Sequence, residues 1–226
     1  INSGKDLRYM LKLLRQVKRH GNQAYVIKHQ IMDTKELGIP HSRPRWYCVG
    51  IRKDASEADS FAFPGKLNCP VIEELLEDDV DSSDIHDRSN RSQTMSMNIR
   101  MAKQRIKESG GNLDQPYVVD CDASRQKSHY MKNISPCLTR SRNKGHWLIH
   151  KNRRMSIKEM MRLQGIDPDT FKQVVSDSVM GQQIGNAMSV NVIERILARA
   201  LRAAGLVYLP CLQESRTKLD RWETGN

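Results

Sequence analysis

Two arginines, Arg43 and Arg45, are the residues whose types and spacing first suggest chemistry. They lie in a segment, residues 38–52, that begins with Gly-Ile-Pro, which fixes a bend, and continues into the aromatic and β-branched residues of an expected strand at 46–51. In an extended segment, side chains at i and i+2 project to the same side. Two guanidiniums on one face could clamp a phosphate or a carbonyl oxygen. They could equally be ordinary arginines that solvate the end of a strand.

The charge of the chain points to an anionic partner. The formal net charge is +11 over 226 residues, and nucleic acid is the commonest polyanion that a basic protein binds. Residues 125–154 carry nine Lys or Arg and no acid, whereas residues 73–87 carry eight acids and no Lys or Arg. A charge run is often only a solvated face, but a long window without one acid favours contact with a polyanion.

The five cysteines show no Cys-x-x-Cys or Cys/His ligand spacing. We therefore expect no disulfide framework and no metal site, and the reducing interior of a cell as the natural setting. No long apolar run predicts a membrane span, and no charged-then-apolar leader is visible. The chain starts with Ile, which suggests a fragment or a processed product.

The elements that must position the arginines follow from periodicity. Apolar residues at three- and four-residue spacing predict a helix over 6–20 that Gly21 ends, and Ser156 with Glu159 forms a capping box that opens a helix ending at Gly165. A Gly185-Asn186 turn is expected to open a helix that runs to about Ala204, and to offer free amides to a ligand. Further expected elements are strands at 24–32, 116–120 and 147–149, a short helix at 71–76 and a polar, flexible insertion at 77–115.

Four blocks stand in a fixed order along the chain. They are the arginine segment, Cys137-Leu138-Thr139 ahead of Gly145-His146-Trp147, the stretch 154–165 that ends in Leu-Gln-Gly, and the stretch 183–188 that contains Gly-Asn. Together they resemble the C-terminal half of a C5-cytosine-specific DNA methyltransferase, with its Gln-x-Arg-x-Arg block, target-recognition region, Leu-Gln-Gly block and Gly-Asn block. The resemblance covers roughly residues 7–205.

The sequence departs from the family pattern in places. His41 stands where the family has Gln, and Ile166-Asp167-Pro168 replaces Phe-Pro after the Leu-Gln-Gly block. The cofactor loop, the Pro-Cys-Gln nucleophile and the Glu-Asn-Val acid are absent. Pro136-Cys137 imitates the nucleophile pair, but Leu-Thr follows it, and Cys137 is interpreted as a residue of the recognition region. Because the nucleophile is missing, we expect the chain to be inactive alone.

The resemblance implies roles for particular residues. In the family a Cys thiolate attacks C6 of a flipped cytosine, and S-adenosyl-L-methionine supplies the methyl group. Arg45, supported by Arg43, would hold the flipped nucleotide and stabilise developing charge. The resemblance gives Asn186 and Met188 the amino-acid end of the cofactor, and it gives Thr139, Arg140 and Arg142 the DNA backbone.

The implied architecture is an α/β protein. It comprises the C-terminal part of a class I S-adenosylmethionine-dependent methyltransferase sheet and a smaller, irregular β-rich target-recognition domain. Residues 1–54 and 153–205 would belong to the catalytic domain, 55–152 to target recognition and 206–226 to a polar tail. The expected partners are double-stranded DNA and the missing N-terminal half, in the same chain or in a partner subunit.

Two other functions stay open at this point. One is the tRNA-directed branch of the same family, in which a Cys-Phe-Thr signature is expected where this chain has Cys-Leu-Thr. The other is a non-catalytic DNA-binding or regulatory remnant. Comparing methyl acceptance by tRNA and by duplex DNA would distinguish the tRNA-directed branch from a DNA methyltransferase. Salt-dependent DNA binding that is unaffected by the cofactor would favour the non-catalytic remnant.

Overall fold

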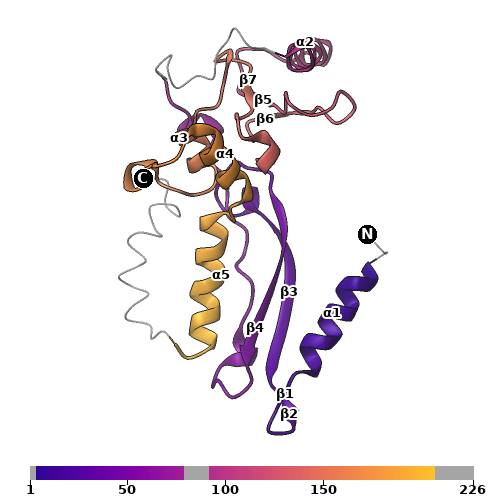
Figure 1. Cartoon of the computed structure of the whole chain (residues 1–226), viewed down its shortest axis with the longest axis vertical. Coiled ribbons are helices and arrows are strands. Elements are labelled where there is room, and N and C mark those ends of the chain that lie inside the picture. Colours follow the sequence, from indigo (N-terminus) through magenta and orange to yellow (C-terminus); the bar gives the residue numbers. More distant parts are fainter. Residues whose placement is uncertain (1–3, 79–91, 207–226) are drawn as a thin grey trace. The chain divides into compact units, whose positions relative to one another are not determined.

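The computed structural model describes residues 4–78 and 92–206 (Figure 1). The chain divides into two compact units: unit 1 holds Ile1–Met32, Pro44–Lys66 and Val192–Asn226, and unit 2 holds Asp33–Arg43 and Leu67–Asn191. Helices and small sheets alternate through both units, which confirms the predicted α/β class. No helix of the described part is long and apolar enough to cross a membrane.

Unit 1 is built around a two-stranded sheet. The strand expected at 24–32 is confirmed as β3 (Tyr25–Asp33). It pairs with β4 (Pro44–Arg52), the strand that follows the bend at residues 38–40. Lys28 of β3 binds the loop that follows β4, because its Nζ donates to the carbonyls of Asp59, at 2.9 Å, and Phe61. The helices that belong mainly to this unit are α1 (Lys5–Gln16) and α5 (Val190–Ala203).

The first helix is shorter than the sequence predicts, because a hairpin follows it. Strands β1 (Lys18–Arg19) and β2 (Asn22–Gln23) pair antiparallel around His20 and Gly21. Both turn residues have positive φ, 51° and 84°, the conformation that a tight two-residue hairpin turn requires. Gly21 is therefore a turn glycine, and the prediction that it ends the helix was wrong.

Unit 2 contains a four-stranded antiparallel sheet in the order β6-β5-β7-β8. Two of its strands confirm the predictions at 116–120 and 147–149. The strand bounds are β5 Tyr117–Val119, β6 Tyr130–Lys132, β7 Trp147–Leu148 and β8 Arg153–Arg154. All three residues of β5 are buried, because helix α2 packs on one side of the strand and neighbouring strands pair along both edges.

The prediction of a flexible polar insertion at 77–115 was wrong for its second half, where α2 runs over Gln93–Glu108. The Ser92 side chain accepts from the amide of Met95 and caps the helix. Met95, Ile99, Ala102 and Ile106 form a buried face that packs against Val119 and Trp147 of the sheet, among others. Residues 79–91 of the insertion, like the polar tail at 207–226, lie outside the described residues.

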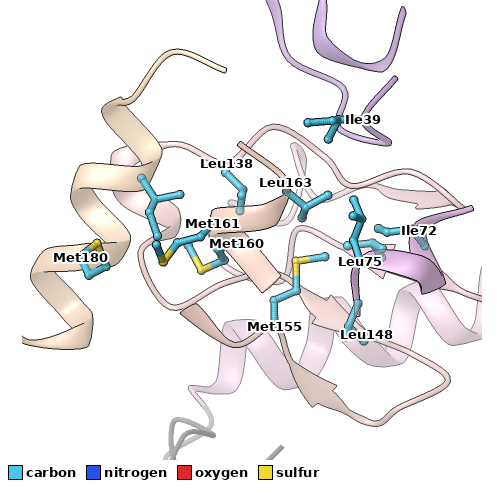
Figure 2. Close-up of a cluster of buried hydrophobic side chains, with 12 residues drawn as sticks. Ile39, Ile72, Leu75, Leu138, Leu148, Met155, Met160, Met161, Leu163 and Met180 are labelled. Carbon is cyan, nitrogen blue, oxygen red and sulfur yellow. The ribbon is translucent and has the colours of Figure 1, made fainter. Parts of the chain in front are cut away.

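A second core lies under the short helices of unit 2 (Figure 2). Helix α3 (Ile157–Arg162) begins at the predicted capping box, in which Ser156 and Glu159 satisfy each other's backbone amides. Its side chains Met160 and Met161 pack with Leu163, Leu138 and Ile39. Helix α4 (Asp177–Asn186), which the sequence did not predict, contributes Met180 and Ile184.

The compact units do not follow the predicted domain bounds. Residues 153–191, expected in the catalytic domain, belong to the same unit as most of the expected recognition region. The reason is visible in the core, where Met155, Met160 and Leu163 share one cluster with Val118 and Leu148 of the four-stranded sheet. The assignment of these ranges to catalysis or recognition stays a prediction.

Candidate functional site

Arg43 is a buried connector within unit 2. Only 3% of the residue is exposed. Its guanidinium donates to the carbonyls of Leu138, Ala187 (2.6 Å) and Gly185 (3.1 Å), and lies 3.5 Å from the Cys137 sulfur. Its backbone amide donates to Asp33 Oδ1 at 2.7 Å. One cation therefore joins the backbone at Leu138 to the backbone at the end of α4.

His41 makes a second connection beside Arg43. The ring is fully buried, and its Nε2 accepts the amide of Leu138 at 3.0 Å. Its Nδ1 must then carry the proton, which it donates to the carbonyl of Leu163 at 3.0 Å. A neutral imidazole thus offers one donor and one acceptor, as the amide of the family's Gln would. The departure at this position preserves the hydrogen-bonding capacity.

The Gly-Asn block does not form the turn that the sequence predicted. Gly185 and Asn186 are the last residues of α4, and α5 starts only at Val190. A Cβ on Gly185 would lie 2.3 Å from the carbonyl carbon of Thr139, and one on Gly181 would lie 2.0 Å from the carbonyl oxygen of Asn143. These two glycines let α4 pack directly on the backbone of 139–143, and this close approach explains their presence better than free amides.

Asn186 and Met188, the predicted cofactor contacts, lie at the end of α4 and just beyond it. Asn186 is exposed, and Met188 is 59% exposed. The following residue, Ser189, is buried, donates to Gln164 Oε1 at 2.9 Å and shares a hydrogen bond with Thr34. An exposed carboxamide and thioether on a fixed backbone can contact the amino-acid end of S-adenosyl-L-methionine. Neither residue lines the two cavities described in this chain, and their contact with the cofactor stays a prediction.

The three predicted DNA contacts occupy one short helical turn, Arg140–Arg142, and its preceding residue Thr139. Arg140 is exposed, and its Nε donates to Gln182 of α4 at 3.3 Å. The Thr139 hydroxyl shares a hydrogen bond with Ser141. Arg142 differs, because its Nε donates at 2.6 Å to the carboxylate of Asp120, where only 20% of the arginine side chain is exposed. The structure therefore leaves Arg140 most available to a phosphate.

Arg45 belongs to unit 1 and is half-buried, whereas Arg43 is buried in unit 2. Its guanidinium donates to the carbonyl of Pro44 at 2.7 Å. The two arginines are therefore not an equivalent pair. Arg43 is committed to backbone carbonyls, and Arg45 keeps a partly accessible guanidinium at the start of β4.

A largely buried cluster of ionisable side chains around Asp120 and Asp122 was not predicted. His146 is 1% exposed, and its Nδ1 lies 3.8 Å from Asp120. Burial lowers the pKa of His146 to about 4, so the ring is neutral near pH 7. Arg154 forms a bidentate ion pair with Asp122, in which Nη1 donates to Oδ2 and Nη2 donates to Oδ1, both at 2.7 Å. No local pattern could have found this cluster, since its members come from β8, the loop after β5 and the loop before β7.

Glu159 serves as an anchor, and its partner is Arg153. Its carboxylate accepts two bonds from that guanidinium, at 2.6 and 2.8 Å, and both side chains are buried. It also accepts the amides of Ser156 and Glu77. The neighbouring Arg154 does not take part in this pair and binds Asp122 instead. Among the described residues no cluster of three metal-ligating side chains occurs.

The comparisons with known proteins define the class. The family model for C-5 cytosine-specific DNA methylase matches residues 2–202, and the chain belongs to this family. Members of the family take their methyl group from S-adenosyl-L-methionine.

Curated relatives agree with the family assignment. The chain is 28% identical to Type II methyltransferase M.NgoBI of Neisseria gonorrhoeae over 85% of its own length and 54% of that protein. It is 24% identical to Type II methyltransferase M.HpaII of Haemophilus parainfluenzae over 92% of this chain and 58% of the relative. The chain thus spans about half the length of the curated relatives that it matches.

Solved structures support the fold. The methyltransferase EhMeth of Entamoeba histolytica is similar with a TM-score of 0.54 and 16% identity, over 89% of this chain and 59% of that one. The Dnmt2 methyltransferase of S. pombe gives a TM-score of 0.53 and 17% identity, over 91% of this chain and 64% of that one. Identities this low show the fold alone, which is that of a class I methyltransferase.

Proposed function

We propose that this chain is the C-terminal portion of a DNA (cytosine-5-)-methyltransferase, and that it supplies target recognition and part of the active site. The observation that carries the proposal is the family match over residues 2–202, which gives the reaction class. The cofactor supplies the methyl group, and polypeptide outside this sequence supplies the nucleophilic Cys and the acidic Glu. We propose that this further polypeptide lies either in the same chain or in a partner subunit.

Differences in burial and hydrogen bonding support different roles for the residues of this chain. Arg45, whose guanidinium is partly accessible, would hold the flipped cytosine and stabilise charge on its ring. Asn186 and Met188 would contact the cofactor from one side. Thr139 and Arg140 would contact the DNA backbone, positioning the protein without reading bases. Arg43 would act through the backbone it holds, as a positioning residue.

Arg142 has a supporting part in this scheme. Asp120 fixes its guanidinium at 2.6 Å, so Arg142 holds the turn that presents Arg140, and its own contact with a phosphate would be secondary. The predicted domain roles are retained as proposals: residues 1–54 and 153–205 serve catalysis and 55–152 serve recognition.

The test is reconstitution. The chain is combined with the N-terminal half of a family methyltransferase, and transfer of a labelled methyl group is measured on duplex DNA and on tRNA. We expect methylation of DNA by the pair and none by this chain alone. Methyl transfer by this chain alone would refute the proposal that it is only the C-terminal portion of the enzyme. Methyl transfer to tRNA but not to DNA would identify tRNA as the substrate.

A second measurement separates the enzyme from a binding remnant. With both halves present, a duplex containing a fluorinated cytosine should trap the enzyme covalently, and Arg45→Ala should abolish the trap. Salt-dependent DNA binding that persists without any trapping or turnover would identify a non-catalytic DNA-binding protein instead.

A further inference from the structure

Helix α2 carries a row of cations on its outer side. Arg100, Lys103 and Lys107 recur at i, i+3 and i+7, a spacing that places them on one face of a helix. The buried residues that hold the helix on the sheet occupy a neighbouring face, about 100° around the helix from this row. Because the helix packs on the sheet through its apolar face, the cationic row is not part of that packing.

These charges are not used within the part of the chain that the structure describes. Arg100, Lys103 and Lys107 make no side-chain hydrogen bond or ion pair there. The single acid of α2, Glu108, is hydrogen-bonded to Gln104 at 2.8 Å. Favourable interaction with the helix dipole could account for Lys107 in the last turn, but it fades within one turn and does not account for Arg100.

A second group of basic residues lies between α2 and the loop that leads into β6. Arg105, Arg125 and His129 line one small cavity together with Ser128, and no acid lines it. The two acids that follow β5 are already engaged, since Asp120 binds Arg142 and Asp122 binds Arg154. Like charges that converge without a counter-ion repel one another, and an anion at this place would relieve the repulsion.

We propose that α2, through the cationic row on one flank and Arg105 on the other, forms with the loop 124–130 an additional phosphate-contact surface for duplex DNA. We name it the α2 surface and define it by Arg100, Lys103, Arg105, Lys107 and Arg125. This inference rests on the proposed function, because it takes DNA as the substrate. It extends the expected backbone contacts beyond the turn at 139–142 to a helix that sequence patterns placed in a flexible insertion.

The dimensions of the α2 surface fit a sugar-phosphate backbone. Seven residues separate Arg100 from Lys107, which corresponds to a rise of about 10 Å along the helix. That rise equals about three phosphate-to-phosphate steps along the axis of one DNA strand. The contacts are charge-based and carry no base information, so the α2 surface should strengthen binding to every sequence alike.

The test measures duplex DNA binding by the full chain as a function of salt, without cofactor. Two variants remove two charges each, R100A/K103A on the helix row and R105A/R125A at the cavity. The matched control, K158A/K172A, removes two exposed lysines elsewhere in unit 2. Alanine favours helix at the α2 positions, so folding is preserved, and circular dichroism checks it.

We expect each α2-surface variant to bind DNA more weakly and to make the slope of log affinity against log salt shallower by about 1.8, or about 0.9 per lost contact. The ratio of affinities for different DNA sequences should not change. The control should keep the wild-type slope. Equal slopes in all three variants would overturn the α2 surface, as would weakening of RNA binding with duplex DNA binding unchanged.

This outcome is separable from that of the proposed function. Binding is read without cofactor, whereas the proposed function is read by methyl transfer with both halves present. If reconstituted enzyme fails to methylate DNA while the variants show the expected slopes, the methyltransferase assignment falls and the α2 surface stands. If methylation succeeds and the slopes are unchanged, the α2 surface falls alone.

Discussion

Arg43 and Arg45 are two residues apart, yet their surroundings predict opposite results on mutation. Arg43→Ala would leave the buried carbonyls of Leu138, Gly185 and Ala187 without their donor. We expect it to lower the free energy of unfolding by about 3 kcal/mol, since each buried unsatisfied acceptor costs about 1–3 kcal/mol. Urea unfolding of the purified chain measures the change.

Arg45→Ala is the matched control, because its guanidinium is only half-buried. It should change stability by less than about 1 kcal/mol but abolish methyl transfer by the reconstituted enzyme. If the two variants destabilise the chain equally, or if Arg45→Ala keeps full activity, the separation of a positioning arginine from a catalytic one is contradicted.

His146 predicts acid sensitivity. Burial lowers its folded-state pKa to about 4, below the ordinary value of 6.5, so the unfolded chain binds more protons between these pH values. The contribution of the neutral His146 ring to the free energy of unfolding is fully present above pH 6.5. It is lost as the pH falls toward 4, by about 1.4 kcal/mol per pH unit. Unfolding free energies between pH 7.5 and 5 should fall less steeply in His146→Gln.

His150 is the competing group, because burial also lowers its pKa while its contact with Glu73 opposes the shift. It remains in His146→Gln, so any acid sensitivity left in that variant measures its share. An unchanged pH profile in His146→Gln would show that the buried ring does not govern acid unfolding.

At the scale of elements, α4 depends on two glycines that a helix would ordinarily avoid. Gly185→Ala should improve helix propensity by about 1 kcal/mol, yet the new Cβ would meet the Thr139 backbone at 2.3 Å. The clash should prevail, destabilising the chain by about 1–3 kcal/mol and displacing the turn that carries Arg140. Thermal unfolding and DNA affinity should both fall.

Gly65→Ala provides the comparison, because a Cβ added at Gly65 would meet no atom within 4 Å and the φ of this residue is ordinary. It should leave both measurements unchanged. Wild-type DNA affinity in Gly185→Ala would mean that α4 does not hold the contact turn in place.

The elements that the sequence predicted correctly are those fixed by local signals. β-branched and aromatic runs marked β3, β4 and β5, and the reciprocal bonds of Ser156 and Glu159 marked α3. Helix α2 was missed because its apolar residues are diluted by polar ones, although they recur at helical spacing from Met95 to Ile106.

The candidate site was predictable in its residue types and not in its contacts. The pairing of Arg43 with two segments about 95 and 142 positions away in the sequence depends on long-range packing. The same holds for Asp120 with Arg142, and for the approach of Gly185 to Thr139. Local patterns could mark these residues as notable, but only the tertiary structure separates connectors from groups that remain accessible.

At the scale of the whole molecule, unit 1 leaves one side of α1 uncovered in the described part. Tyr9 (64% exposed), Met10 (40%) and Leu13 (47%) lie on adjoining positions of the helix. Since the chain spans about half the length of its relatives, we expect the N-terminal half of the methyltransferase domain to cover this face. Leu13→Asp should therefore leave the stability of the isolated chain unchanged and impair reconstitution.

Lys12→Asp is the control for Leu13→Asp, because Lys12 is an exposed polar neighbour on the same helix. It should support reconstituted methyl transfer at the wild-type level. Reconstitution by Leu13→Asp at the wild-type level, measured over a range of N-terminal-half concentrations, would show that another surface receives that half.

The position of Arg43 between two backbones has a thermodynamic consequence. One guanidinium binds carbonyls beside both the expected DNA-contact turn and the expected cofactor-contact segment, so a ligand that shifts either segment changes the energy of the other. Linkage requires such an effect to be mutual: whatever factor the cofactor adds to DNA affinity, DNA must add to cofactor affinity. The two ligands would then communicate through a side chain that touches neither of them.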